Sequence, residues 1–343
     1  MKKLKSIQAL RFVAAFAVLA GHLGYHALFP GNSHPALKVL RSVTDMFVFA
    51  GVDMFFIISG AIMYLVTRGT VGQASGPRTL EFIFRRGARI YPAFWISALL
   101  GVFIFTGSAF DPLVLAQQVA LLNTPLFQPA AWTMVYEVRF YLMVALVLLF
   151  AGRKLDLGFG VWAVLLSVAV ILRAYGILPA DAATDLLMLE FMIGVGVGAL
   201  ISREIFVFPL WMVTAGVVGF TLTTVYLFPN NMNGWRVYGY GLPMAAILYG
   251  AVGLEHHGLQ VPGLMSFLGD ISYSLYLWHL PIALLLRPLV PSGGLAAGLF
   301  YIVICTAVSL AVACASFLLI ERPVARWAYG HSMTRGWGVP KPV

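Results

Sequence analysis

Charged residues are scarce in this chain of 343 residues: they make up 10% of it, whereas hydrophobic residues make up 61%. A soluble globular domain has about 25% charged and 45–50% apolar residues. The shortage of charge therefore excludes an ordinary soluble domain. Apolar runs recur from end to end, and the mean hydropathy is +0.90. We expect an all-α integral membrane protein.

Cysteine is nearly absent as well. Cys305 and Cys314 both fall in the last apolar run, and their spacing on one helix places them roughly 13 Å apart, too far for a disulfide. His256 and His257 are adjacent but have no cysteine or carboxylate at ligand spacing. We therefore expect no disulfide framework and no metal site. No internal repeat of the transporter kind is present in the sequence either.

The apolar runs define about ten transmembrane spans, because about 20 helical residues cover the hydrocarbon core of a bilayer. We expect spans at about 7–29, 44–67, 89–108, 132–151, 158–178, 183–201, 207–228, 236–254, 269–290 and 297–320. Together they form one transmembrane domain over residues 1–343, with the helices around a central cavity. The segment 109–131 is too short to cross twice, so we expect it to be an outer or re-entrant segment.

The net charge of +9 is unevenly distributed along these spans. Most lysines and arginines, among them Lys2, Lys3 and Lys5, fall on one side when the spans alternate across the membrane. Positive residues concentrate in cytoplasmic loops of membrane proteins. The pattern predicts that both termini are cytoplasmic and that 68–88 is the longest clearly cytoplasmic loop.

The first span contains two ionisable residues, Arg11 near its start and His22 eleven positions later. Helical rise places His22 roughly 16 Å deeper than Arg11, close to the bilayer midplane. A group at that depth must face protein or water, so His22 is a candidate functional residue. A neutral histidine hydrogen-bonded between helices is the alternative. In the second span, Asp53 is either functional or a structural partner of an intramembrane arginine.

Arg85, Arg86 and Arg89 form a basic cluster at the mouth of the third span. If the helix has already begun there, Arg85 and Arg89 share one face and Arg86 lies beside them. Such a cluster suits bidentate capture of phosphates. Alternatively, it is only a topology anchor that binds anionic lipid.

Later spans add further ionisable and small residues. Glu137 and Arg139 are two positions apart on a helix, so they point to different faces and each needs another partner. His279 reaches a depth similar to that of His22 from a different helix, and Pro281 kinks that helix and frees backbone carbonyls. Gly194 and Gly198 predict a close helix–helix contact.

Six stretches, in order from residue 7 to residue 323, resemble the membrane-bound acyltransferase 3 family. They read IQALRFVAAFAVLAGH, GVDMFFIISG, FRRGARIYPAFW, WTMVYEVRFY, LGDISYSLYLWHLP and ERP. Within the family they are most similar to the bacterial O-acetyltransferases of exopolysaccharides, the ExoZ-like branch. The resemblance implies a ten-helix domain that takes acyl groups from cytosolic acyl-CoA. Unlike some members of the family, this chain is expected to have no SGNH or other soluble domain.

The resemblance also suggests roles for individual residues. Arg11 and His22 match the first-helix pair of the family, in which the histidine is associated with catalysis. Arg86 and Arg89 match its RxxR element on the acyl-CoA side. Glu137 matches the acidic residue of its W-x-x-x-x-E-x-x-F-Y stretch.

These observations predict an O-acetyltransferase that uses acetyl-CoA as donor and a sugar hydroxyl of an exopolysaccharide or its lipid-linked precursor as acceptor. His22 is the predicted general base, oriented by Glu137 or Asp53. The residues predicted to bind the donor are Arg11, Arg85, Arg86 and Arg89. The candidates for substrate or oxyanion contacts are Ser59, Tyr136, Tyr141 and His279. We expect a location in the bacterial inner membrane, with lipid and sugar partners and no nucleic acid.

Two other classes of protein compete with this interpretation. A polysaccharide or lipid-linked sugar transporter or flippase would also bury ionisable residues within its helices. It would move substrate without turning over acyl-CoA, and the arginine cluster would then have only a topological role. A structural or partner-binding membrane subunit is a third alternative, but it needs none of the buried ionisable residues.

Overall fold

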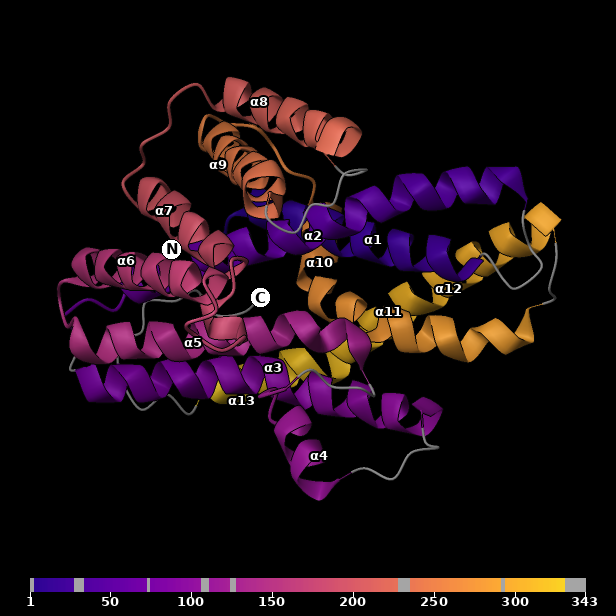
Figure 1. Cartoon of the computed structure of the whole chain (residues 1–343), viewed down its shortest axis with the longest axis horizontal. Coiled ribbons are helices and arrows are strands. Elements are labelled where there is room, and N and C mark those ends of the chain that lie inside the picture. The colour runs from indigo at the N-terminus through magenta and orange to yellow at the C-terminus, as the bar shows by residue number, and fades with distance from the viewer. Residues whose placement is uncertain are drawn as a thin grey trace.

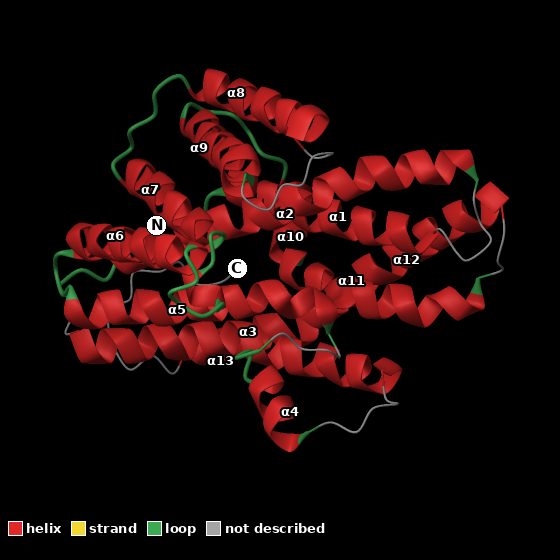
Figure 2. Ribbon diagram, viewed as in Figure 1, coloured by secondary structure: helices red, strands yellow, loops and turns green. Residues whose placement is uncertain are grey.

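The computed structural model describes residues 3–27, 34–72, 75–105, 111–123, 128–227, 235–290 and 294–330. In these residues all regular elements are helical and no strand is present (Figure 2), which confirms the predicted all-α class. The α-helices are α1 (Lys5–Ala27), α2 (Pro35–Arg68), α3 (Ser75–Phe105), α4 (Pro112–Val119), α5 (Trp132–Phe150), α6 (Leu155–Ala174), α7 (Met188–Ser202), α8 (Pro209–Leu222), α9 (Leu242–His256), α10 (Gly263–Asp270), α11 (Ser272–Leu286), α12 (Gly294–Ser316) and α13 (Arg322–Gly330).

Eight helical segments of the described residues are long and apolar enough to cross a membrane. They contain α1, α2, α3, α5, α6, α8, α9 and α12 with α13. The two remaining predicted spans are 183–201 and 269–290. The first contains α7, an apolar helix of 15 residues, and the second contains α11, also of 15 residues, which follows α10 after Ile271. Ten crossings therefore stay a prediction. The predicted cytoplasmic termini include residues 1–2 and 331–343, which lie outside the described residues.

The helices extend further into the predicted loops than hydropathy indicated. α2 begins at Pro35, where the ring nitrogen of His34 accepts a hydrogen bond from the Ala36 amide at 3.3 Å. α3 begins at Ser75, so the prediction of a loop over 68–88 was wrong from residue 75 onward. The side chain of Arg78 explains this difference, because it is buried and donates hydrogen bonds to the carbonyls of Thr67 and Gly152. An arginine satisfied by backbone carbonyls stabilises a helix start that apolar periodicity does not predict.

The predicted outer or re-entrant segment contains one short helix. Asp111 caps α4 by accepting hydrogen bonds from the Leu113 and Val114 amides. Eight residues span only about 12 Å, so α4 does not cross the membrane, and it stands at the edge of the bundle (Figure 1). Residues 106–110 and 124–127 lie outside the described part of the chain.

α1 and α2 form the centre of the arrangement (Figure 1). α2 packs along α1 on one side and along α7 on another, and α9 with its neighbour α8 covers the same region. α11 and α12 pack against α1, whereas α3 packs against α5 and α13. α11 also contacts α3, so the sides of the bundle meet around α1, α2, α3, α5 and α11.

The contact between α2 and α7 is close because glycines line it. A Cβ built on Gly194 would lie 2.1 Å from the Ile57 carbonyl oxygen, and one built on Gly60 would lie 2.0 Å from that of Phe191. Such distances leave no room for any side chain. This confirms the predicted close helix contact at Gly194.

Candidate active site

A pocket of about 60 Å³ lies where α1, α2, α3, α5 and α11 meet. Most of its lining is apolar, but six of the predicted site residues contribute to it: Arg11, Ser59, Arg86, Arg89, Glu137 and Tyr141. They come from four helices and span more than a third of the sequence. The structure therefore brings two arginines of the basic cluster, the first-helix arginine and the acidic residue of α5 into one space.

Arg86 and Arg89 face the pocket because they lie three positions apart on α3, on one side of the helix. The Arg86 guanidinium lies about equally far from the rings of Phe82 and Tyr141, at 5.9 and 5.8 Å. Its Nε atom is buried and has no hydrogen-bond partner among the described residues. Arg89, which also lines the pocket, is exposed.

The third arginine of the cluster has a different environment. Arg85 forms an ion pair of 2.5 Å with Glu81, one turn earlier on α3, and its guanidinium lies 4.3 Å from the centre of the Tyr329 ring of α13. It does not belong to the described pocket lining. The structure therefore separates Arg85 from Arg86 and Arg89.

Glu137 is the carboxylate in this lining. It accepts a hydrogen bond from the Ser59 hydroxyl at 3.3 Å and another from the Tyr141 hydroxyl, one turn later on α5. Arg11, Arg86 and Arg89 thus share the pocket with a single acidic lining residue. An excess of cationic groups in a partly dry space favours an anionic ligand.

Asp53, by contrast, pairs with an arginine outside the pocket lining. Its fully buried carboxylate accepts hydrogen bonds from Nη2 and Nε of Arg236, at 2.5 and 2.9 Å. The Arg236 guanidinium also lies 4.9 Å from the centre of the Phe49 ring. This geometry fits the alternative in which Asp53 is a structural partner of an intramembrane arginine. Sequence reasoning missed Arg236 because 183 positions separate the partners.

A second buried carboxylate lies near this pair. Glu190 of α7 is fully buried, and neither of its carboxylate oxygens has a hydrogen-bond partner among the described residues. A Cβ built on Gly241 would lie 3.3 Å from one of them. Glycine at position 241 therefore leaves the room that the Glu190 side chain occupies.

His22 and His279 lie together next to Tyr276. Nε2 of His279 is 3.1 Å from Nδ1 of His22, and the ring centres are 5.0 Å apart. Tyr276 lines the pocket, and its ring centre lies 5.8 Å from that of His279. Neither histidine belongs to the described pocket lining. The two histidines, which were predicted to lie at a similar depth, are therefore in direct contact.

Tyr136 lies apart from both groups, stacked on Phe56 with ring centres 5.8 Å apart. Three other polar residues line the pocket but were not predicted as site residues: Thr133, Tyr273 and Tyr276. Thr133 and Tyr276 share a hydrogen bond of 2.8 Å. Tyr273 and Tyr276 belong to the LGDISYSLYLWHLP stretch, in which polar residues interrupt an apolar span. That interruption is the sequence signal that could have identified them as site residues.

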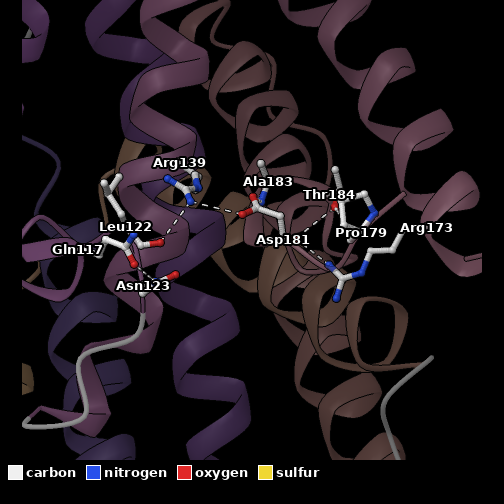
Figure 3. Close-up of polar contacts among 9 residues, drawn as sticks. All are labelled: Gln117, Leu122, Asn123, Arg139, Arg173, Pro179, Asp181, Ala183 and Thr184. Carbon is white, nitrogen blue, oxygen red and sulfur yellow. Dashed lines mark hydrogen bonds and ion pairs between the residues drawn. The ribbon is translucent and has the colours of Figure 1, made fainter. Parts of the chain in front are cut away.

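Arg139 finds its partners away from the pocket, as its spacing from Glu137 predicted. Figure 3 shows Arg139 donating hydrogen bonds to the Leu122 carbonyl and to the Asp181 carboxylate, while Arg173 bonds the Asp181 carbonyl at 2.7 Å. Partial burial opposes ionisation of Asp181, but the Ala183 amide and Arg139 outweigh it and hold the pKa of this carboxyl below its ordinary value. This cluster connects α5 and α6 to the segment between α6 and α7.

Comparison with known proteins places this geometry in a family. The chain is 28% identical to the exopolysaccharide production protein ExoZ of Rhizobium meliloti (strain 1021), over 84% of this chain and 92% of that protein. No solved structure matches the chain. The family model described as an acyltransferase domain matches residues 4–318. The chain therefore belongs to the membrane-bound acyltransferase 3 family.

Proposed function

We propose that this protein is an O-acetyltransferase of the bacterial inner membrane. It transfers an acetyl group from cytosolic acetyl-CoA to a sugar hydroxyl of an exopolysaccharide or of its lipid-linked precursor. Family membership supports acyl transfer, and the printed name of the relative supports an exopolysaccharide acceptor. The observation that carries the proposal is the pocket in which Arg11, Arg86 and Arg89 accompany a single acidic residue, Glu137.

The pocket suits the phosphates of coenzyme A. Arg86 has a buried Nε–H without a partner among the described residues, and a buried donor of this kind is costly unless a ligand satisfies it. A phosphate oxygen is a strong acceptor for a guanidinium. Arg89 is exposed, and Arg11 is buried and donates a hydrogen bond to Gln8. Arg11, Arg86 and Arg89 would thus bind acetyl-CoA through its phosphates.

The chemistry then takes place at His22. Its Nε2 takes the proton of the acceptor hydroxyl while the hydroxyl oxygen attacks the thioester carbon. The tetrahedral intermediate collapses, the carbon–sulfur bond breaks, and the proton passes from Nε2 to the departing thiolate. The products are the acetyl ester and coenzyme A. Tyr276 lines the pocket and contacts His279, whereas neither histidine belongs to the described pocket lining. The slender pantetheine arm must therefore pass beyond the lining to reach His22.

Purified protein and a deletion strain test the proposal together. Wild-type protein should convert acetyl-CoA to coenzyme A in the presence of acceptor, and the strain should lose sugar acetylation. His22→Ala should lower turnover by about 10²–10⁴-fold while leaving donor binding unchanged. Sugar movement without any release of coenzyme A would instead identify a transporter. Normal turnover by His22→Ala would remove the base assignment.

A further inference from the structure

The contact between His22 and His279 assigns a proton to one nitrogen of each ring. Nδ1 of His279 lies 2.7 Å from the Tyr276 carbonyl oxygen and 3.3 Å from that of Leu275. Carbonyl oxygens only accept hydrogen bonds, so this Nδ1 bears the proton. In the neutral ring, Nε2 of His279 then carries the lone pair and accepts a hydrogen bond.

The same reasoning applies to His22. Its Nδ1 lies 3.0 Å from the Val18 carbonyl oxygen and 3.1 Å from Nε2 of His279. Both neighbours are acceptors, so Nδ1 of His22 is the donor and bears the proton. The lone pair of the neutral ring is therefore on Nε2, the nitrogen that a general base needs.

The carboxylates expected to orient His22 have other partners. Asp53 is engaged by Arg236, and Glu137 accepts hydrogen bonds from Ser59 and Tyr141. In base–carboxylate pairs the acid holds the imidazole in one tautomer and stabilises the imidazolium. Next to His22, Nε2 of His279 takes the place of the carboxylate as the acceptor for Nδ1–H.

We propose that His279 is the positioning residue of His22, and that the two rings form a histidine–histidine pair in place of a histidine–carboxylate pair. This inference rests on the proposed function. His279 is fully buried and fixed by the Tyr276 carbonyl, so its Nε2 lone pair is held towards His22. When Nε2 of His22 takes the hydroxyl proton, the positive charge is shared with Nδ1–H, and the lone pair of His279 stabilises it. After proton return to the thiolate, both rings are neutral again.

Three variants of His279 test this role. His279→Leu should lower kcat by about 10–100-fold, less than the 10²–10⁴-fold contribution of a general base, because His22 itself is retained. The KM for acetyl-CoA should stay unchanged because the arginine pocket is intact. His279→Gln offers an amide oxygen near the position of Nε2 and should restore much of the lost turnover. His279→Asn is too short to place an acceptor there and should behave like leucine. His256→Leu, on α9 and packed against Phe206, is the control and should retain wild-type activity.

A spectroscopic measurement on the full-length protein is independent of turnover. With ¹⁵N-histidine label, wild-type His22, assigned by its loss in His22→Ala, should give the signature of a proton on Nδ1. In His279→Leu the signal should move towards a mixture of tautomers, because the Nδ1 proton then loses the acceptor nitrogen of His279. A proton on Nε2 in the wild type would overturn the inference.

The outcomes separate the two proposals. If His22→Ala is inactive while His279→Leu keeps normal kcat, the positioning role fails and the proposed function stands. If both variants are fully active, the base assignment itself fails. If glutamine restores no more turnover than leucine or asparagine, His279 does not act through its acceptor nitrogen, and the positioning role is overturned.

Discussion

The side-chain amide of Gln128 donates a hydrogen bond of 2.6 Å to the carbonyl oxygen of Leu277. Leu277 lies four positions before Pro281, which has no N–H to donate within α11. Gln128 therefore supplies the donor that the proline removes. Both groups are fully buried, so this contact stabilises α11, the helix that presents Tyr276 to the pocket and His279 to His22.

Gln128→Leu should lower the free energy of unfolding by about 1–3 kcal/mol, because it leaves a buried carbonyl without a donor. Thermal unfolding of detergent-purified protein measures the change, and Gln260→Leu, at an exposed position, is the control. In a Pro281→Ala background the helix regains its own donor, so the same glutamine substitution should cost less. An equal cost in both backgrounds would contradict this account of the contact.

Asp53→Asn should lower the yield of folded protein sharply. Removing one partner of a buried ion pair leaves the other charge uncompensated, at a cost of about 3–5 kcal/mol. Replacing both Asp53 and Arg236 by leucine removes the stranded charge and should recover much of that yield, measured by size-exclusion chromatography. A folded Asp53→Asn protein without acetyl transfer would instead support the catalytic role predicted from the sequence.

Gly194→Ala should separate α7 from α2. The added methyl group would meet the Ile57 carbonyl at 2.1 Å, and overpacking of this kind costs about 1–3 kcal/mol or more. Gly196→Ala is a matched control on the same helix, because a Cβ there meets nothing within 4 Å and alanine favours a helix by about 1 kcal/mol. Equal melting temperatures for the two variants would show that the glycine contact is not required.

Arg86→Ala should weaken acetyl-CoA binding by about 10–100-fold, the equivalent of one lost hydrogen bond between charged groups. Arg86→Lys should recover only part of the affinity, because an ammonium group lacks the planar fork of a guanidinium. Arg203→Ala, on the exposed ion pair with Asp156, is the control. Titration calorimetry with coenzyme A measures all three variants. If Arg86→Ala binds coenzyme A with unchanged affinity, the alternative in which the arginine cluster is only a topology anchor is favoured.

Arg85→Ala should weaken donor binding less than Arg86→Ala. Arg85 is paired with Glu81 and packs on Tyr329, outside the described pocket lining. The same calorimetric titration distinguishes the two arginines. A larger loss for Arg85→Ala would mean that the donor reaches a surface beyond this pocket.

Much of the helical architecture could be predicted because hydropathy and helical rise are local properties. α1 and α5 lie within two residues of their predicted ends in the described chain. The start of α3 could not be predicted, since it depends on Arg78 reaching the carbonyls of Thr67 and Gly152. Those acceptors come from the end of α2 and the turn after α5, and no local pattern reports them.

The sequence by itself determined the membrane class, the similar depth of His22 and His279, and the different faces of Glu137 and Arg139. Each of these follows from distances along one chain or around one helix. Only the tertiary structure decided which groups meet side by side: the two histidines, 257 positions apart, and Asp53 with Arg236. The reason is physical, because depth depends on residue number within a span, whereas a lateral neighbour depends on how helices distant in sequence pack against one another.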